Sequence, residues 1–291
     1  MCGSSVSWIT VLTVRAVGIA SPAGGTVDPA MARRRVDTLL AERGLAESRT
    51  SAAASVRAGL VRLEPGGRRA EKPSQLVPDD AELVLDEGRR FASRGGLKLE
   101  HALELLGIEV AGRDCLDIGA STGGFTDCLL QRGAARVIAL DVGYGQLEWR
   151  LREDPRIEVL ERTNARDVKP ADLPWAPWLA TIDVSFISLA KVLPAVAGVL
   201  APGGEILALV KPQFELERGR VGKGGVVRDA AGRRAALVSV ARAARELGVA
   251  VLGVAPSGLP GPKGNRETFI HLSREGDGLD DLERGALEVE P

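Results

Sequence analysis

Residues 117–125 run Asp117-Ile118-Gly119-Ala120-Ser121-Thr122-Gly123-Gly124-Phe125 and join an apolar run to a segment with helical spacing. Glycines in such a loop let the backbone approach a ligand, and the N-terminus of the following helix offers unpaired N–H groups. Asp141 follows Gly119 by 22 residues, at the end of the next apolar run. A carboxylate at that place can accept hydrogen bonds from a ribose diol. The pattern therefore predicts a strand, a loop and a helix that together bind a cofactor containing a ribose.

Strand-like and helical segments alternate around this loop. The expected strands are 114–118, 136–141, 157–160, 180–184, 205–210, 249–254 and 268–272, and the expected helices are 97–106, 125–131, 189–200 and 230–246. Such alternation predicts a doubly wound α/β sheet, Rossmann-like, with right-handed crossovers. The last two strands are joined by a stiff loop rich in Pro and Gly instead of a helix, so we expect one antiparallel strand at the end.

A shorter, basic unit precedes this sheet, at residues 31–86. Helical spacing is expected from Arg34 to Leu45 and from Glu47 to Val56, with strands at 60–63 and 81–85. Residues 31–73 hold ten basic side chains against five acidic ones, an excess of five in a chain whose net charge is -1. We therefore expect a small α+β domain, whose basic face is either a solvated surface or a nucleic-acid contact.

The order of these elements resembles the S4 RNA-binding domain. In that family the basic helical face meets RNA phosphates, where the release of counterions supplies affinity without reading the sequence. The resemblance implies that RNA binds to Arg33, Arg34, Arg35, Arg49, Arg57, Arg62 and Arg68.

The glycine-rich loop by itself would equally suit a nicotinamide enzyme. However, it lacks the G-x-G-x-x-G register, and a carboxylate precedes its first glycine. The form Asp-x-Gly-x-x-x-Gly-Gly-Phe resembles the first motif of S-adenosylmethionine (SAM)-dependent methyltransferases. The resemblance implies a SAM site made of Asp117, Gly119, Ser121, Gly123, Gly124, Phe125, Asp141, Asn164 and Asp183. Asp141 would meet the ribose and Asn164 the adenine.

Four charged residues lie at the ends of expected elements: Lys98, Asp183, Lys211 and Glu267. Taken singly, each is an ordinary surface charge. The carboxyl ends of parallel strands line one crevice, so Asp183 and Lys211 are expected to face the ligand. Together the four resemble the Lys-Asp-Lys-Glu tetrad of ribose 2'-O-methyltransferases of the FtsJ type.

With the basic unit included, residues 33 to 273 resemble the TlyA family, whose members are called both hemolysin-like proteins and ribosomal RNA 2'-O-methyltransferases. The stretches that carry the resemblance are 93–99, the glycine-rich loop, 183–188, 210–215 and 263–267. The resemblance implies methylation of cytidine riboses in the 16S rRNA, the 23S rRNA or both, with ribosomal RNA or a ribosomal subunit as the partner.

The chemistry suits the residues. A ribose hydroxyl is a poor nucleophile, so a nearby ammonium must stabilise the developing alkoxide or, as a free amine, accept its proton. Lys211 is the candidate for this role. Asp183 would orient Lys211 and lie near the methionine end of the cofactor, while Lys98 and Glu267 would hold the ribose and the lysine network. No metal is expected.

Composition agrees with a globular protein, since 45% of the residues are hydrophobic and 26% are charged. Cys2, Cys115 and Cys128 fit neither a disulfide framework nor a zinc site, which favours the reducing cytoplasm. No apolar run is long enough to predict a membrane-spanning helix. The alternatives are a hemolysin-like membrane-active protein and a non-catalytic RNA-binding protein.

The expected domain plan has five parts. Residues 1–30 are a disordered extension or precede the true start at Met31, and 31–86 form the S4-like domain. A linker covers 87–93, the methyltransferase domain covers 94–273, and an acidic tail covers 274–291.

Overall fold

The computed structural model describes residues 33–57, 59–85, 90–276, 278–279 and 281–290. The chain divides into two units, Met1–Gly88 and Arg89–Pro291, and each has a hydrophobic core of its own. The extension expected at residues 1–30 and the alternative start at Met31 lie outside the described residues.

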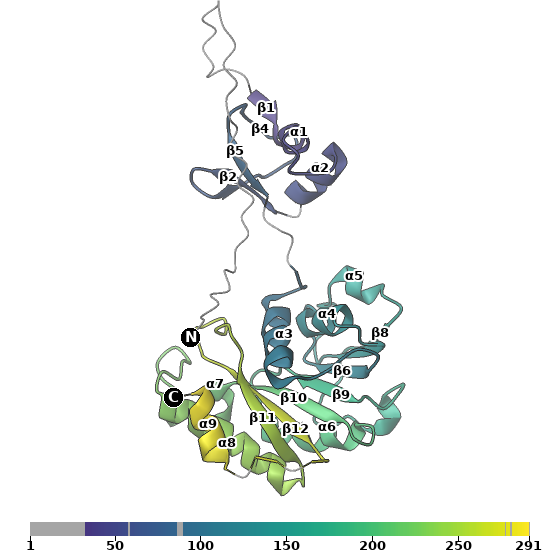
Figure 1. The fold of residues 1–291 in the computed structure, drawn as a ribbon, viewed down its shortest axis with the longest axis vertical. Coiled ribbons are helices and arrows are strands. Elements are labelled where there is room, and N and C mark those ends of the chain that lie inside the picture. Colours follow the sequence, from purple (N-terminus) through teal and green to yellow (C-terminus); the bar gives the residue numbers. More distant parts are fainter. Residues whose placement is uncertain (1–32, 58, 86–89, 277, 280, 291) are drawn as a thin grey trace, which may run out of the picture. The chain divides into compact units, whose positions relative to one another are not determined.

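The smaller unit contains two helices and short antiparallel strands (Figure 1). Its helices are α1 (Val36–Glu42) and α2 (Arg49–Arg57), and its strands are β1 (Arg33–Arg35), β2 (Val61–Glu64), β3 (Arg68–Arg69), β4 (Leu76–Pro78) and β5 (Glu82–Leu85). β3, β2 and β5 form one sheet, and β1 pairs with β4. The helix expected from Arg34 therefore begins only at Val36, because Arg33–Arg35 form a strand that pairs with Leu76–Pro78.

The larger unit is built on a seven-stranded sheet. Its strands are β6 (Asp114–Ile118), β7 (Arg136–Leu140), β8 (Ile157–Leu160), β9 (Leu179–Ile182), β10 (Glu205–Val210), β11 (Ala250–Pro256) and β12 (Thr268–Ser273). They lie in the order β11-β12-β10-β9-β6-β7-β8. β12 is antiparallel to both of its neighbours, while the other pairs are parallel. The expected doubly wound sheet, in which the last strand of the chain is antiparallel, is confirmed, and this strand lies between β11 and β10.

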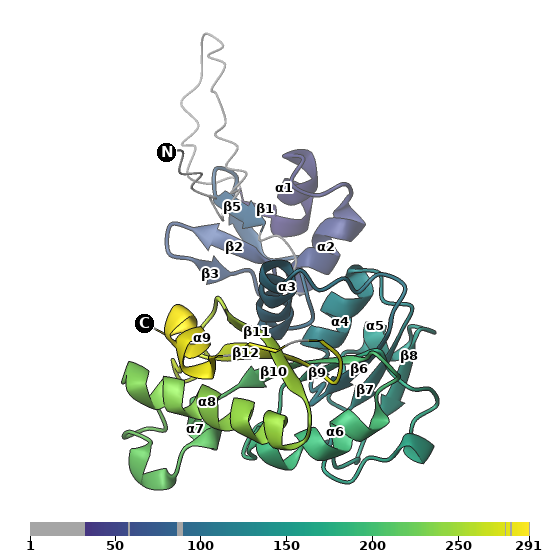
Figure 2. The same cartoon turned by 60° about the horizontal axis from the view of Figure 1, so that its bottom comes forward.

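Helices cover both faces of this sheet (Figure 2). One face packs against α3 (Arg94–Leu106), α4 (Gly124–Gln131) and α5 (Trp149–Arg152), and the other against α6 (Leu193–Val199), α8 (Ala230–Glu246) and α9 (Leu282–Val289). Side chains alternate along each strand, so in β6 Cys115 joins one hydrophobic cluster while Leu116 and Ile118 join the other. The short elements are α7 (Pro212–Glu215) and the 3-10 turns η2 (Pro170–Asp172), η3 (Leu189–Lys191) and η4 (Arg218–Arg220).

Three expected segments differ in detail from what the structure shows. The helix expected at 189–200 is divided into η3 and α6, where Pro194 lies in the first turn of α6 and lacks the N–H that a continuous helix would need. Phe91, expected in the linker, is 1% exposed and belongs to the core of the larger unit. The residues expected to be an acidic tail contain α9, which buries Leu282 against the sheet's second face.

Candidate active site

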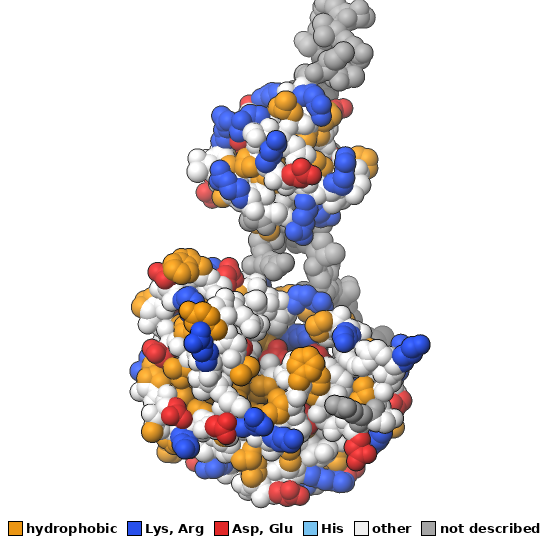
Figure 3. Space-filling view, turned by 180° about the vertical axis from the view of Figure 1, so that it is seen from behind, with side chains coloured by type: hydrophobic (Ala, Val, Ile, Leu, Met, Phe, Trp, Pro, Cys, Tyr) orange, Lys and Arg blue, Asp and Glu red, His pale blue; other side chains and the backbone are white. Residues whose placement is uncertain are grey.

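A cavity of about 970 Å³ lies at the carboxyl ends of the parallel strands. Its lining comes from the segments that follow β6, β9 and β10, from the start of α3, and from the loop that precedes β12. The face of the larger unit drawn in Figure 3 is hollowed, and hydrophobic and basic side chains gather around the hollow. Ligands of open α/β sheets bind in this position, because the loops after adjacent strands converge there.

The glycine-rich loop forms one wall of the cavity. Gly119 has a φ of +82°, and a Cβ atom at this position would lie 2.5 Å from the backbone oxygen of Asp183. Gly119 thus lets the segment after β6 pass close to the segment after β9. Gly119, Ser121, Gly124 and Phe125 line the cavity, whereas Gly123 does not.

Asp117 lies behind this loop and outside the cavity lining. Its carboxylate accepts hydrogen bonds from the backbone N–H of Thr126 at 2.8 Å and from the hydroxyls of Thr126 and Thr181 at 2.7 and 3.3 Å. Complete burial raises the pKa of Asp117 to about 7, against the hydrogen bonds from Thr126, which lower it. The hydrogen bonds of the fully buried Asp117 therefore connect β6 to the start of α4, and its expected contact with a cofactor stays a prediction.

Two other residues expected at the cofactor, Asp141 and Asn164, are engaged in hydrogen bonds with the backbone. Asp141 accepts hydrogen bonds from the backbone N–H groups of Ser121 and Gly143, at 2.8 and 2.6 Å. Its carboxylate therefore lies directly behind a cavity-lining residue of the loop. Asn164 accepts from the backbone N–H of Arg166 at 3.1 Å and forms a local turn. Neither Asp141 nor Asn164 lines the cavity.

The four charged residues expected to react all line the cavity, as two ion pairs. Lys98 Nζ lies 2.5 Å from Glu267 Oε2, and both side chains are buried. Lys211 forms the second ion pair with Asp183, and its Nζ donates to the hydroxyl of Ser185 at 3.1 Å. This pair is more accessible, since 28% of the Asp183 side chain is exposed. An ammonium group held by a carboxylate can act on a hydroxyl that enters the cavity.

Two aromatic residues at the cavity, one of them exposed, were not assigned a role from the sequence. Phe186 is 92% exposed and adopts a φ of +64°, although it is not a glycine. The centroid of its ring lies 5.1 Å from that of Phe214. Both residues line the cavity. The signal in the sequence was the presence of an aromatic residue in each of the polar segments that follow Asp183 and Lys211.

The arginines of the smaller unit differ in their partners. Arg34 pairs with Glu42, Arg35 and Arg49 pair with Asp37, and Arg62 pairs with Glu64. Arg33 donates to the backbone oxygen of Leu76. The hydrogen bond from Arg35 lowers the pKa of Asp37 to about 2. Arg57 and Arg68 are exposed and have no ion pair within the described ranges.

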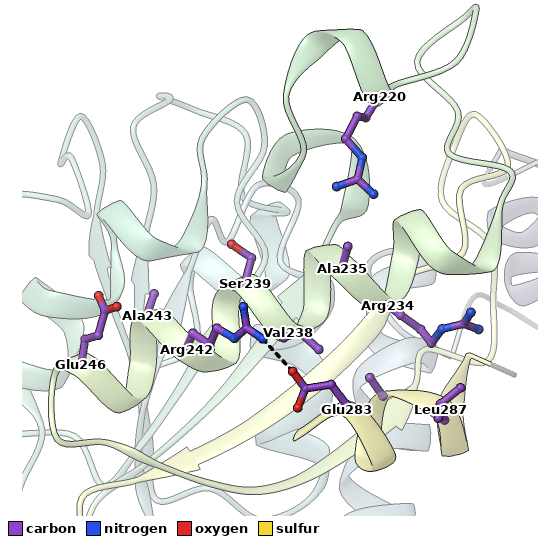
Figure 4. Close-up of a pocket in the computed structure, with 11 residues that line it drawn as sticks. Arg220, Arg234, Ala235, Val238, Ser239, Arg242, Ala243, Glu246, Glu283 and Leu287 are labelled. Carbon is purple, nitrogen blue, oxygen red and sulfur yellow. Dashed lines mark hydrogen bonds and ion pairs between the residues drawn. The ribbon is translucent and has the colours of Figure 1, made fainter. Parts of the chain in front are cut away.

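A second cavity, of about 740 Å³, lies between α8 and α9 (Figure 4). Arg220 of η4 also lines it, and Arg242 pairs with Glu283 across it at 2.7 Å. The guanidinium of Arg234 donates to the backbone oxygen of Glu290. None of the residues expected at the active site lies in this cavity, and two of its three cations are engaged by the protein itself.

Within the part of the chain that the structure describes, no group of three or more His, Cys, Asp or Glu side chains is arranged to hold a metal ion. No helix in the same residues is long and apolar enough to cross a membrane.

Comparison with known proteins gives consistent matches. A family model described as FtsJ-like methyltransferase matches residues 91–274. The 16S/23S rRNA (cytidine-2'-O)-methyltransferase TlyA of Mycobacterium tuberculosis is 52% identical over 270 residues, which are 90% of this chain and 100% of that protein. Hemolysin A of Brachyspira hyodysenteriae is 39% identical over 239 residues, covering 82% of this chain and 99% of its own. A solved structure described as a hemolysin from Streptococcus thermophilus has a TM-score of 0.67 and 43% identity, over 89% of this chain and 96% of that one.

Proposed function

Because this chain belongs to the FtsJ-like methyltransferase family, and within it to the TlyA family, we propose that it transfers a methyl group from SAM to the 2'-oxygen of cytidine in ribosomal RNA. The substrate is the 16S rRNA, the 23S rRNA or both. The observation that carries the proposal is the cavity shared by the glycine-rich loop and by two lysine–carboxylate pairs.

The cavity suits SAM in size and lining. Gly119 brings the backbone close to the ligand space, and α4 begins at the end of the same loop. Ser121, Gly124 and Phe125 would contact the cofactor, while Asp141, which lies behind this lining, fixes the position of Ser121. SAM supplies a methyl group on a sulfonium, which is already activated for transfer.

Lys211 acts on the acceptor hydroxyl. A ribose hydroxyl has a high pKa, so the Lys211 amine must accept its proton or, as an ammonium, stabilise the charge that develops on the oxygen. The ion pair with Asp183 fixes the direction of the Lys211 side chain, and Ser185 adds a second contact. The main contribution of the protein is then the alignment of the hydroxyl with the methyl group.

Lys98 and Glu267, the other ion pair of the cavity, would hold the acceptor ribose and the lysine network. Their ion pair is buried, so the two charges have little access to bulk water and keep a fixed geometry. Phe186 offers an exposed ring on which the target base can stack once it leaves its helix.

The smaller unit is proposed to be an S4-like domain that grips rRNA. Exposed Arg57 and Arg68 supply phosphate contacts, and the excess of five positive charges in residues 31–73 favours RNA over a neutral partner. A ribosomal substrate implies that the protein works in the cytoplasm.

The proposal is tested with purified full-length protein, SAM carrying a labelled methyl group, and ribosomal subunits that lack this modification. Calorimetry should show SAM binding, and label should appear in 16S or 23S rRNA. SAM binding without any label in either RNA would contradict the rRNA assignment, and leakage of liposomes by the protein without SAM would support the membrane-active alternative.

A further inference from the structure

Glu215 joins the two segments that carry Asp183 and Lys211. It is the last residue of α7, the short helix that begins directly after Lys211. Its Oε2 accepts a hydrogen bond from the hydroxyl of Ser188 at 2.7 Å, and its Oε1 accepts one from the backbone N–H of Leu189 at 2.9 Å. Both carboxylate oxygens are therefore engaged by the segment that follows Asp183.

That segment is fixed at both of its ends. The backbone N–H of Asp183 donates to the carbonyl oxygen of Ile118 at 2.9 Å. At the other end, the hydroxyl of Ser188 accepts from the backbone N–H of Ala190 and so caps η3. Between these two points lies Phe186 in the left-handed conformation, which a residue other than glycine keeps only where its surroundings hold it.

Glu215 is placed for hydrogen bonding and not for pairing with a cation. Among the residues that the structure describes, no Lys or Arg forms an ion pair with it. Its partial burial raises its pKa, and the hydrogen bonds from Leu189 and Ser188 oppose this change. The two hydrogen bonds join α7 to the segment that follows Asp183. Because both segments contribute residues to the lining of the cavity, this link makes the cavity wall more rigid.

We propose that Glu215 is a positioning residue for methyl transfer. By joining α7 to residues 188–189, it fixes the position of Phe186 relative to Lys211, and therefore the position of a stacked nucleotide relative to the group that acts on its hydroxyl. The inference rests on the proposed function, since it assumes an RNA acceptor at Lys211. A displacement of about 1 Å at a reacting centre is sufficient to lower a rate roughly a hundredfold.

The test compares four full-length proteins: the wild type, Glu215→Ala, Glu215→Gln and Glu217→Ala. Glu217 is an exposed carboxylate two positions further along and is the matched control. Glu215→Ala should lower kcat for rRNA methylation by about tenfold or more and leave the Kd for SAM within about twofold. Glu215→Gln keeps an acceptor for Leu189, so it should restore kcat to within about threefold of the wild type. Glu217→Ala should match the wild type.

A second readout does not depend on RNA. Hydrogen exchange at the backbone N–H of Leu189 should become faster in Glu215→Ala and stay unchanged in Glu217→Ala, because only the first variant loses the acceptor. If Glu215→Ala does not fold, Ser188→Ala removes one of the two bonds and should lower kcat by about threefold in the same assay.

The result separates this inference from the proposed function. If the wild type does not methylate rRNA, the proposed function is contradicted, while faster exchange at Leu189 would still support the link between the two segments. If the wild type methylates rRNA and the kcat of Glu215→Ala is unchanged, or SAM affinity falls in parallel with kcat, the positioning role is contradicted.

Discussion

Nζ of Lys98 lies 2.5 Å from Oε2 of Glu267, although 169 positions separate the two residues in the chain. The exposed fraction of the side chain is 9% for Lys98 and 1% for Glu267. Removing one partner of a buried pair leaves the other charge uncompensated, which costs about 3–5 kcal/mol. We predict that Lys98→Ala lowers the free energy of unfolding by about 3 kcal/mol, measured by denaturant titration.

An exposed ion pair in the same unit is the control for this prediction. Arg284 and Glu288 are paired at 3.7 Å, with side chains 78% and 68% exposed. Because water screens this pair, Arg284→Ala should change the free energy of unfolding by less than about 0.5 kcal/mol. If Lys98→Ala and Arg284→Ala lowered the free energy of unfolding equally, burial of the ion pair would not govern the effect.

Gly119→Ala should disturb the cavity by pushing two strand ends apart. The added methyl group would lie 2.5 Å from a backbone oxygen of Asp183, which cannot turn away as a flexible side chain could. We predict at least a tenfold weaker affinity for SAM by calorimetry and a lower Tm. Gly145→Ala is the matched control, since Gly145 also has a positive φ but no atom lies within 4 Å of the added Cβ. The idea fails if both variants bind SAM equally well.

The buried carboxyl of Asp117 predicts a pH dependence of stability. Its pKa is raised by burial to about 7 in the folded chain, so the folded chain holds this proton more tightly than the unfolded chain does. The resulting stabilisation is fully present below about pH 4 and is lost as the pH rises through about 7. Between about pH 5 and about pH 8, the free energy of unfolding of Asp117→Asn should therefore fall less than that of the wild type. Parallel curves for the two proteins would contradict the raised pKa.

The arginines of the smaller unit should not contribute equally to RNA affinity. Arg57 and Arg68 are exposed and carry no ion pair in the described ranges, whereas Arg34 and Arg35 are paired with carboxylates. Each lost phosphate contact lowers the slope of log affinity against log salt by about one unit. We predict a loss of about two units for the double variant Arg57→Ala/Arg68→Ala and a smaller loss for Arg34→Ala/Arg35→Ala. Salt titrations of rRNA binding would contradict this if all the slopes coincide with that of the wild type.

Periodicity in the sequence predicted the sheet of the larger unit closely, because each strand is a local apolar run and each helix a local repeat. The strand Asp114–Ile118 and the helix Ala230–Glu246 have the bounds that were expected. Elements that depend on distant partners were missed. β1 exists because it pairs with β4, and α9 because Leu282 finds a surface on the sheet.

The sequence likewise predicted some contacts of the candidate site and missed others. The order of the strands explains why Asp183 and Lys211 meet, since both follow parallel strands that are neighbours in the sheet. The role of Asp117 could not be read from the loop, because a carboxylate before a glycine has the same sequence whether it faces a ligand or Thr126. The hydrogen bonds of Glu215 depend on side-chain geometry that the spacing of residues in the sequence does not reveal. The same is true of the ion pairs that Arg34 and Arg35 form with carboxylates.

The proposed chemistry is examined most directly by identifying the methylated nucleoside. Wild-type protein and the Lys211→Ala and Asp141→Ala variants are each incubated with SAM and unmodified ribosomal subunits, and the rRNA is digested to nucleosides for mass spectrometry. The wild type should yield 2'-O-methylcytidine. Lys211→Ala should yield at least about a hundredfold less while keeping its affinity for SAM, because it loses the group that acts on the hydroxyl. Asp141→Ala should lose SAM affinity first, since Ser121 would no longer be fixed. A methyl group on the base, or equal yields of 2'-O-methylcytidine from the wild type and Lys211→Ala, would contradict the account.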